Sequence, residues 1–252
     1  MISAQHTASL FAILAGCVGL VIGSHLATIA LRWPAGRSSA TGRSHCDGCD
    51  RVLAAYELVP LLSWLVLRGR CRRCGARIDW RHPAVEAAAG VLAVALAVAL
   101  PPAAAIAGMG LAWTLLLLTV LDLDHYWLPD RLTLPLLAAG LLVGAAGIGP
   151  VLTDRIIGAA VGWGVLALVA LIYVRVRGRI GLGGGDPKLF AAAGAWLGWR
   201  MLPVTLLIAS AAGLALVLAA VIVRRQVSAT TRVPFAPMIA FATIIGWIWV
   251  AR

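Results

Sequence analysis

Residues 87–121 read AAAGVLAVALAVALPPAAAIAGMGLAWTLLLLTVL and contain no Asp, Glu, Lys or Arg. A membrane-spanning helix needs about 20 apolar residues, so this run is long enough for two spans. Pro101 and Pro102 break the run, because proline lacks a backbone N–H and interrupts a helix. The stretch therefore predicts two membrane-spanning helices and excludes an ordinary water-soluble fold.

The rest of the chain has the same apolar character. Hydrophobic residues make up 62% of it, and its mean hydropathy is +0.95. Further runs without Asp, Glu, Lys or Arg cover residues 1–31, 132–153, 156–174, 189–199, 201–223 and 233–251. The run 189–199 would reach only about 16 Å, so it spans only if the bilayer thins locally or Arg200 snorkels. We therefore predict an all-α, polytopic membrane helix bundle of about eight spans.

The basic residues predict how the bundle is oriented. The chain has 21 Lys and Arg residues and a net charge of +11. If the first span runs from outside to inside, only Arg155, Arg200 and Arg252 lie outside, so the positive-inside rule places both termini outside. Topology and contact with anionic lipid headgroups explain the charge. No basic run is interleaved with aromatic residues, so we expect no nucleic-acid partner.

The one long hydrophilic region, from residue 32 to about residue 83, carries two CxxC pairs separated by 21 residues. The four cysteines are Cys46, Cys49, Cys71 and Cys74. Two such knuckles can complete a tetrahedron around Zn²⁺, and the reducing cytoplasm disfavours disulfides. Four cysteines leave no open coordination position, so the predicted metal is structural; the alternative is a set of reduced, unliganded thiols. The apolar segment 53–67 between the pairs is predicted to lie on the inner leaflet, because Glu57 and Pro60 make it a poor span.

Two of the ten acidic residues have no simple structural explanation. Asp122 lies at the end of a span, where the helix dipole disfavours an anion, and Asp186 lies within GLGGGDPKLF, residues 181–190. Gly183 and Gly185 indicate a bend where another backbone or an extended substrate approaches closely. The two carboxylates predict a dyad that shares one proton and activates water. The alternatives are an ion-coupled transporter or helix caps, since Pro187 follows Asp186 as it would at a helix start.

The remaining acidic residues are expected in solvated or capping positions. Asp130 follows a proline and precedes an apolar run, which predicts a helix N-cap. Glu57 belongs to the hydrophilic region, Glu86 begins a span, and Asp154 lies in an outer turn beside Arg155.

Three motifs resemble those of the prepilin peptidases. GLGGGDPKL, residues 181–189, resembles their GxGD signature, and DLDHYWLPD, residues 122–130, resembles their first aspartate motif. ELVPLLSWLVLRGRCRRC, residues 57–74, is similar to the ELIPLLSWLxLRGxCRxC stretch of the bifunctional bacterial enzymes. The resemblance extends over residues 23–199.

The resemblance implies an intramembrane aspartic protease of the bacterial inner membrane. It would remove the leader of type IV prepilins or type II secretion pseudopilins at the cytoplasmic face, with Asp122 and Asp186 as the catalytic pair and Gly183 and Gly185 shaping the bend. Many members also methylate the new N-terminus with S-adenosylmethionine, an activity linked to the cysteine-bearing loop. The expected division is a first span at 1–31, a cytoplasmic zinc loop at 32–83 and a peptidase domain at 84–252.

The chain departs from the family pattern in one place. GSHLATIALRWP, residues 23–34, stands where members carry GSFLNVVIxRLP, so His25 replaces an aromatic residue and Ala27 an asparagine. Loss of the amide could remove an interhelical hydrogen bond or a cofactor contact, which weakens the expectation of methylation more than that of proteolysis. Two other classes stay open: a proton-coupled transporter, and a catalytically silent, zinc-stabilised assembly factor.

Overall fold

The computed structural model describes residues 2–37, 43–223 and 233–252, and these form two compact units, Met1–Ala99 and Leu100–Arg252. The described residues form helices and two isolated backbone bridges but no β-strand. The predicted all-α membrane fold is therefore confirmed. Each of the predicted apolar runs contains a helix of its own, with residues 87–121 divided between two.

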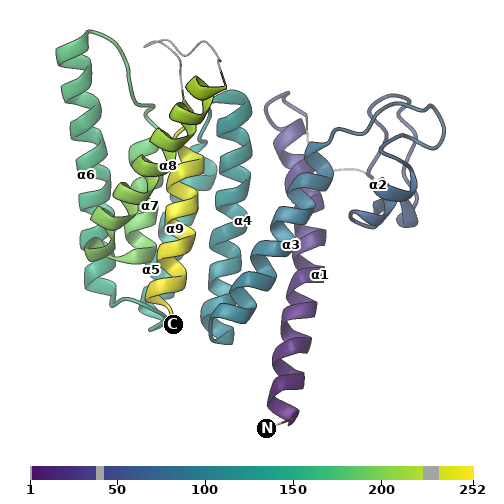
Figure 1. Ribbon diagram of the computed structural model, residues 1–252, viewed down its shortest axis with the longest axis horizontal. Helices are drawn as coiled ribbons and strands as arrows, with labels where there is room; N and C mark the ends of the chain where they lie inside the picture. Colours follow the sequence, from purple (N-terminus) through teal and green to yellow (C-terminus); the bar gives the residue numbers. More distant parts are fainter. Residues whose placement is uncertain (1, 38–42, 224–232) are drawn as a thin grey trace. The chain divides into compact units, whose positions relative to one another are not determined.

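The first unit is a helix pair with a folded loop at one end. Helices α1 (Ile2–Arg32) and α3 (Arg81–Ala99) pack along each other, as Figure 1 shows. The pair can approach closely because glycines line the contact. A Cβ added to Gly19 would lie 2.6 Å from the carbonyl oxygen of Ala89, and one added to Gly23 would lie 2.7 Å from Cα of Glu86.

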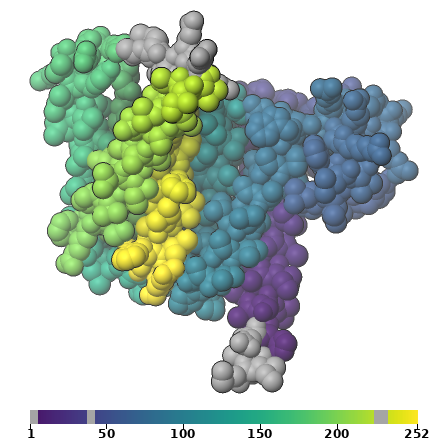
Figure 2. All heavy atoms as spheres, in the orientation of Figure 1, coloured from purple at the N-terminus to yellow at the C-terminus, as the bar shows by residue number. Residues whose placement is uncertain are grey.

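The loop between α1 and α3 forms a lobe beside the helix pair, drawn in blue in Figure 2. Its apolar segment 53–67 forms only a 3₁₀ turn, η1 (Ala55–Leu58), and a short helix, α2 (Leu62–Val66), separated by Leu61 at a φ of 59°. This segment is too irregular to span a bilayer. Its apolar side chains are largely exposed: Tyr56, Leu58, Val59, Leu62, Leu65 and Val66.

The second unit is a bundle built around a short buried helix. Its helices are α4 (Pro102–His125), α5 (Asp130–Ala145), α6 (Leu152–Arg177), α7 (Asp186–Leu197), η2 (Trp199–Met201), α8 (Leu202–Ile222) and α9 (Ala236–Val250). Helix α7 packs against α5, α6 and α9, and every residue of it except Lys188 is buried. Small residues permit this: a Cβ added to Gly158 of α6 would lie 2.5 Å from the carbonyl oxygen of Gly194.

Five helices in the described part of the chain are long and apolar enough to cross a membrane. They are His6–Arg32, Arg81–Ala99, Pro102–His125, Leu152–Arg177 and Trp199–Ile222. Helices α5, α7 and α9 are shorter, so the expected total of eight spans stays a prediction. Only 17% of the apolar window in α6 and 11% of that in α8 is buried, which leaves wide apolar faces for lipid.

Arg155, which the sequence places in an outer turn beside Asp154, is fully buried. Its guanidinium donates hydrogen bonds to the carbonyl oxygens of Gly140, Ile148, Pro150 and Ala195. It also lies over the Trp247 ring, 5.6 Å from the ring centroid. A buried cation is tolerated only when its donors are satisfied, and here one side chain fastens α5, α6, α7 and α9 together.

Candidate active site and metal centre

Asp122 lies on the last turns of α4 and is only 5% exposed. One of its oxygens, Oδ2, accepts a hydrogen bond of 3.0 Å from the backbone N–H of Ala236, the first residue of α9. A helix N-terminus carries partial positive charge and favours an anion. The start of α9 therefore offsets the unfavourable dipole of α4 at this carboxylate.

Asp186 is the first residue of α7 and is 7% exposed. Its Oδ2 accepts a hydrogen bond of 2.9 Å from the N–H of Gly183, so the side chain turns back toward the glycine loop. Gly185, and not Asp186, occupies the N-cap position of α7. The Asp186 carboxylate accepts its hydrogen bond from an N–H that precedes the helix, so helix capping does not explain this residue. Gly185 has no room for a side chain, because a Cβ there would lie 2.6 Å from Cβ of Leu128.

Two contacts join the two aspartate motifs. Leu128, in the loop after α4, abuts Gly185, and the Asp130 carboxylate accepts hydrogen bonds of 2.6 and 2.8 Å from Nζ of Lys188. Asp122 and Asp186 are close enough for their charges to interact. The expected N-cap at Asp130 is wrong: Pro129 occupies that position, and Asp130 pairs with Lys188 instead.

The four cysteines of the first unit meet as the sequence predicted, with their sulfur atoms all within 4.8 Å of one another. Both knuckles repeat one hydrogen-bond pattern. The Cys46 N–H bonds to the Arg51 carbonyl at 2.9 Å, and the Cys71 N–H bonds to the Ala76 carbonyl at 2.8 Å. Backbone N–H groups of Cys74 and Arg73 lower the pKa of the Cys71 thiol to about 6, which favours the thiolate that a metal binds.

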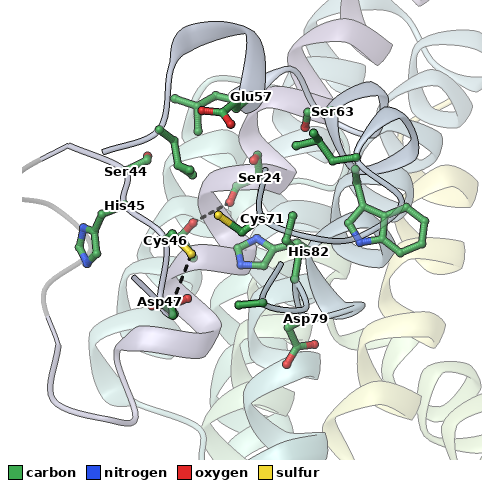
Figure 3. Close-up of a pocket in the computed structure, with 18 of the residues that line it drawn as sticks. Ser24, Ser44, His45, Cys46, Asp47, Glu57, Ser63, Cys71, Asp79 and His82 are labelled. Atoms are coloured by element: carbon green, nitrogen blue, oxygen red, sulfur yellow. Dashed lines mark hydrogen bonds between the residues drawn. The ribbon is translucent and has the colours of Figure 1, made fainter. Parts of the chain in front are cut away.

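A cavity of about 190 Å³ lies between the cysteine knuckles and the helix ends of the first unit. The end of α1 contributes Ser24 and Thr28, and the start of α3 contributes His82. Cys46 and Cys71 also line it, so the cysteine cluster forms part of its wall. In Figure 3, Ser24, Cys71 and His82 gather at the centre of the view.

Two acidic residues that were expected in solvated or capping positions are buried at this cavity. Glu57 forms an ion pair of 2.6 Å with Arg51 and accepts a hydrogen bond from the Ala54 N–H. The Arg51 guanidinium, aided by that N–H, lowers the pKa of Glu57. Glu86 accepts a hydrogen bond of 2.8 Å from the Leu61 N–H. Sequence reasoning missed Glu86 because its partner Leu61 lies 25 positions away. The partners of Glu57, Arg51 and Ala54, lie only 6 and 3 positions before it, so that ion pair had a local signal.

Each of the two units contains residues that match a known protein family. Residues 17–100 match the bacterial peptidase A24 N-terminal domain, and residues 109–218 match the type IV leader peptidase family. The chain belongs to the type IV leader peptidase family. No solved structure matches it.

Curated relatives of this leader peptidase family resemble the chain over most of its length. The prepilin leader peptidase/N-methyltransferase of Aeromonas hydrophila is 43% identical over 208 residues, which cover 82% of this chain and 71% of the relative. The protein of that name from Burkholderia pseudomallei (strain 1026b) is 41% identical, covering 88% and 80%. The one from Pseudomonas aeruginosa is 35% identical, covering 92% and 88%.

The two family matches separate the two polar sites. The cysteine cluster and the cavity lie within the matched N-terminal domain, and both carboxylates of the candidate dyad lie within the matched peptidase part. Ala236, which donates to Asp122, follows the matched residues. The described part of this leader peptidase therefore carries one candidate site in each of its two units.

Proposed function

We propose that the protein removes the leader peptide of type IV prepilins or type II secretion pseudopilins and methylates the new N-terminus. The observation that supports the cleavage step is that two buried carboxylates, Asp122 and Asp186, lie close enough for their charges to interact, beside a glycine loop. The names of the relatives support both activities. Two interacting buried carboxyl groups favour sharing one proton, which is the arrangement that activates water against a peptide bond.

In the proposed cleavage, Asp122 and Asp186 divide the roles of base and acid. The ionised carboxylate takes a proton from water while the water oxygen attacks the scissile carbonyl carbon. The protonated carboxyl gives its proton to the carbonyl oxygen. Collapse of the tetrahedral intermediate breaks the C–N bond, and the leaving amine takes a proton back. The N–H groups of Gly183 and Ala236 orient the carboxylates, and the bend at Gly183 and Gly185 lets the substrate backbone approach.

The proposed setting is a bacterial inner membrane, with the cysteine loop and both aspartates at the cytoplasmic face and the termini outside. The apolar helix of the substrate would enter among the spans while its leader stays in the cytoplasm. The exposed apolar side chains of segment 53–67 support placement on the inner leaflet, among anionic headgroups.

We infer that the four-cysteine site holds structural Zn²⁺. A tetrahedron with Zn–S bonds of about 2.3 Å places its sulfur atoms about 3.8 Å apart. The sulfur atoms of Cys46 and Cys74 lie 3.8 Å apart, so the cluster fits. Cys46, Cys49, Cys71 and Cys74 would hold the ion and fix the wall of the cavity.

S-adenosylmethionine is the cofactor that the proposed methylation requires, and it would supply an electrophilic methyl group. The departures at His25 and Ala27 do not argue against it. Ala27 is fully buried, and neither residue lines the cavity. Their neighbours Ser24 and Thr28 do line it, so the altered motif still presents polar groups there.

Cleavage of a prepilin-like substrate in liposomes, followed by mass spectrometry of the product, tests this proposal. Asp122→Asn and Asp186→Asn are expected to lower the cleavage rate at least about a hundredfold, because each removes a group that transfers a proton. Asp154→Asn is the matched control, since Asp154 lies in the same unit but contacts Trp199 and Arg200. Normal cleavage by folded Asp122→Asn and Asp186→Asn proteins would refute the dyad and favour a silent assembly factor.

A further inference from the structure

Two buried side-chain nitrogen atoms in the described part of the chain have no hydrogen-bond partner, and both belong to residues that line the cavity of the first unit. They are Nε of Arg51, whose guanidinium also interacts with the Cys71 thiol, and Nε1 of Trp64. Leaving a buried donor unpaired is costly, so native structures rarely do it without a reason. Two such donors at one cavity indicate a ligand that brings hydrogen-bond acceptors.

Both donors are held in place by their neighbours. The ion pair of 2.6 Å between Nη2 of Arg51 and Glu57 fixes the guanidinium. The Trp64 indole packs against Gly69, where an added Cβ would lie 3.1 Å from the ring atoms and where φ is +67°. Donors that are already oriented lose little conformational freedom when a ligand arrives. This is expected of a preformed binding site.

The lining also carries negative charge that could receive a cation. Glu86 is buried there, whereas Asp47 and Asp79 are paired with Arg37 and Arg81. The same lining includes the cations Arg32, Arg51, Arg72 and Arg77, so it presents both signs of charge. A ligand that combines an acceptor group with a positive charge therefore fits better than a simple anion. The volume of about 190 Å³ lies below the ~300 Å³ of the smaller drug-sized sites, so the cavity encloses one end of such a ligand.

We propose that this cavity binds the zwitterionic amino-acid end of S-adenosylmethionine, with the ligand carboxylate accepting hydrogen bonds from Arg51 Nε and Trp64 Nε1. The ligand ammonium then faces the buried carboxylate of Glu86. This inference rests on the proposed methyl transfer, and it assigns the methyl donor, S-adenosylmethionine, to the cavity of the first unit. The proposed metal would then stabilise the binding site, because its ligands Cys46 and Cys71 form part of the wall of the same cavity.

The test is ligand binding to the purified, zinc-loaded full-length protein, measured by isothermal titration. S-adenosylhomocysteine carries the amino-acid end, whereas methylthioadenosine lacks it. Trp64→Phe keeps a ring and removes the N–H, and Arg51→Lys keeps a cation for Glu57 and removes Nε. Each is expected to weaken S-adenosylhomocysteine binding about tenfold and to leave methylthioadenosine binding unchanged. Trp80→Phe, at an indole that is 67% exposed on the same loop, should bind both ligands as wild type does.

The outcomes separate this inference from the proposed function. Wild type that binds S-adenosylhomocysteine, with equal affinity in folded Trp64→Phe and Arg51→Lys proteins, overturns the cavity assignment and leaves methyl transfer standing. Equal losses of affinity for both ligands also overturn the assignment, because the amino-acid end would not be the part recognised. Wild type that cleaves prepilin but binds neither S-adenosylmethionine nor S-adenosylhomocysteine overturns methyl transfer as well. If one variant fails to fold, the other decides.

Discussion

Glu57 in the first unit and Asp186 in the second are both buried carboxylates, but their partners differ. Glu57 faces the Arg51 guanidinium at 2.6 Å, whereas Asp186 accepts a hydrogen bond from the backbone N–H of Gly183. A cation keeps a carboxylate ionised over a wide pH range, and an amide donor orients it without neutralising its charge. The ion pair of Glu57 stabilises the loop, whereas the hydrogen bond to Asp186 leaves that carboxyl group able to exchange protons.

The same contrast extends to what surrounds each site. The first unit builds its site from a loop that a metal can hold together, next to a cavity with unpaired donors. The second unit builds its site from helix ends, with Asp122 at the end of α4 and Asp186 at the start of α7. Ligand binding and proton transfer thus have separate structural supports, and the predictions below test that separation.

Removal of the metal should have the largest effect, and it should fall on the first unit. The double variant Cys46→Ser and Cys71→Ser is expected to lose about one zinc per chain and all measurable S-adenosylhomocysteine binding, because binding of zinc contributes to folding of such loops. Prepilin cleavage should persist. Zinc analysis, titration and a cleavage assay measure the three effects.

Cys17→Ser is the matched control for the metal prediction, since Cys17 is an exposed residue of α1 outside the cluster. It should retain the zinc. A double variant that binds the donor normally would show that the metal and the cavity are independent.

A methyl group at Gly185 should impair the second unit selectively. Its Cβ would meet Leu128 at 2.6 Å and push Asp186 away from Asp122. Displacement of a catalytic group by about 1 Å can cost about a hundredfold in rate, so Gly185→Ala should lower cleavage by about ten- to a hundredfold. Gly184→Ala is the control, because a Cβ there meets no atom of the described residues within 4 Å. Equal rates for the two variants would contradict the packing argument.

Loss of the Glu57 carboxylate should have a smaller effect, which a measurement of stability detects. Glu57→Gln leaves Arg51 without its counter-ion, so the melting temperature should fall by a few degrees. Because the pKa of Glu57 is lowered in the folded state, its contribution is present above the unfolded pKa of about 4.3. The contribution is lost as the pH falls through the lower folded value.

Thermal melts of wild type and Glu57→Gln at several pH values check this prediction. The difference between the two melting temperatures should be largest near neutral pH and should shrink in acid. A difference that stays constant with pH would show that Glu57 acts through packing and not through charge.

Much of the fold followed from local sequence. Apolar runs must form helices in a membrane, because their backbone groups find no other partners there, and so residues 87–121 gave α3 and α4. The cysteine cluster was also predictable, since CxxC spacing alone brings two thiolates together. The lengths of α5, α7 and α9 could not be predicted from the sequence, because a short helix such as α7 is stable only when its neighbours bury it.

The details of the sites depended on partners that are distant in sequence. Lys188 pairs with Asp130 across 58 positions, which a local capping rule cannot reveal. Glu86 is satisfied by the N–H of Leu61, 25 positions earlier, and so it could be buried. Arg155 can be buried because carbonyl oxygens as far along the chain as Ala195 accept its hydrogen bonds. Buried polar groups of this kind become visible only when the fold is known.

The most direct test of the separation between the two units uses a pilin peptide supplied already cleaved. Incubated with S-adenosylmethionine and folded Asp186→Asn protein, the peptide should gain one methyl group at the wild-type rate, measured by mass spectrometry. The same protein should leave an intact prepilin uncleaved. A pre-cleaved peptide that stays unmethylated with this variant, while wild type methylates it, would contradict the account and show that both reactions depend on the aspartate pair.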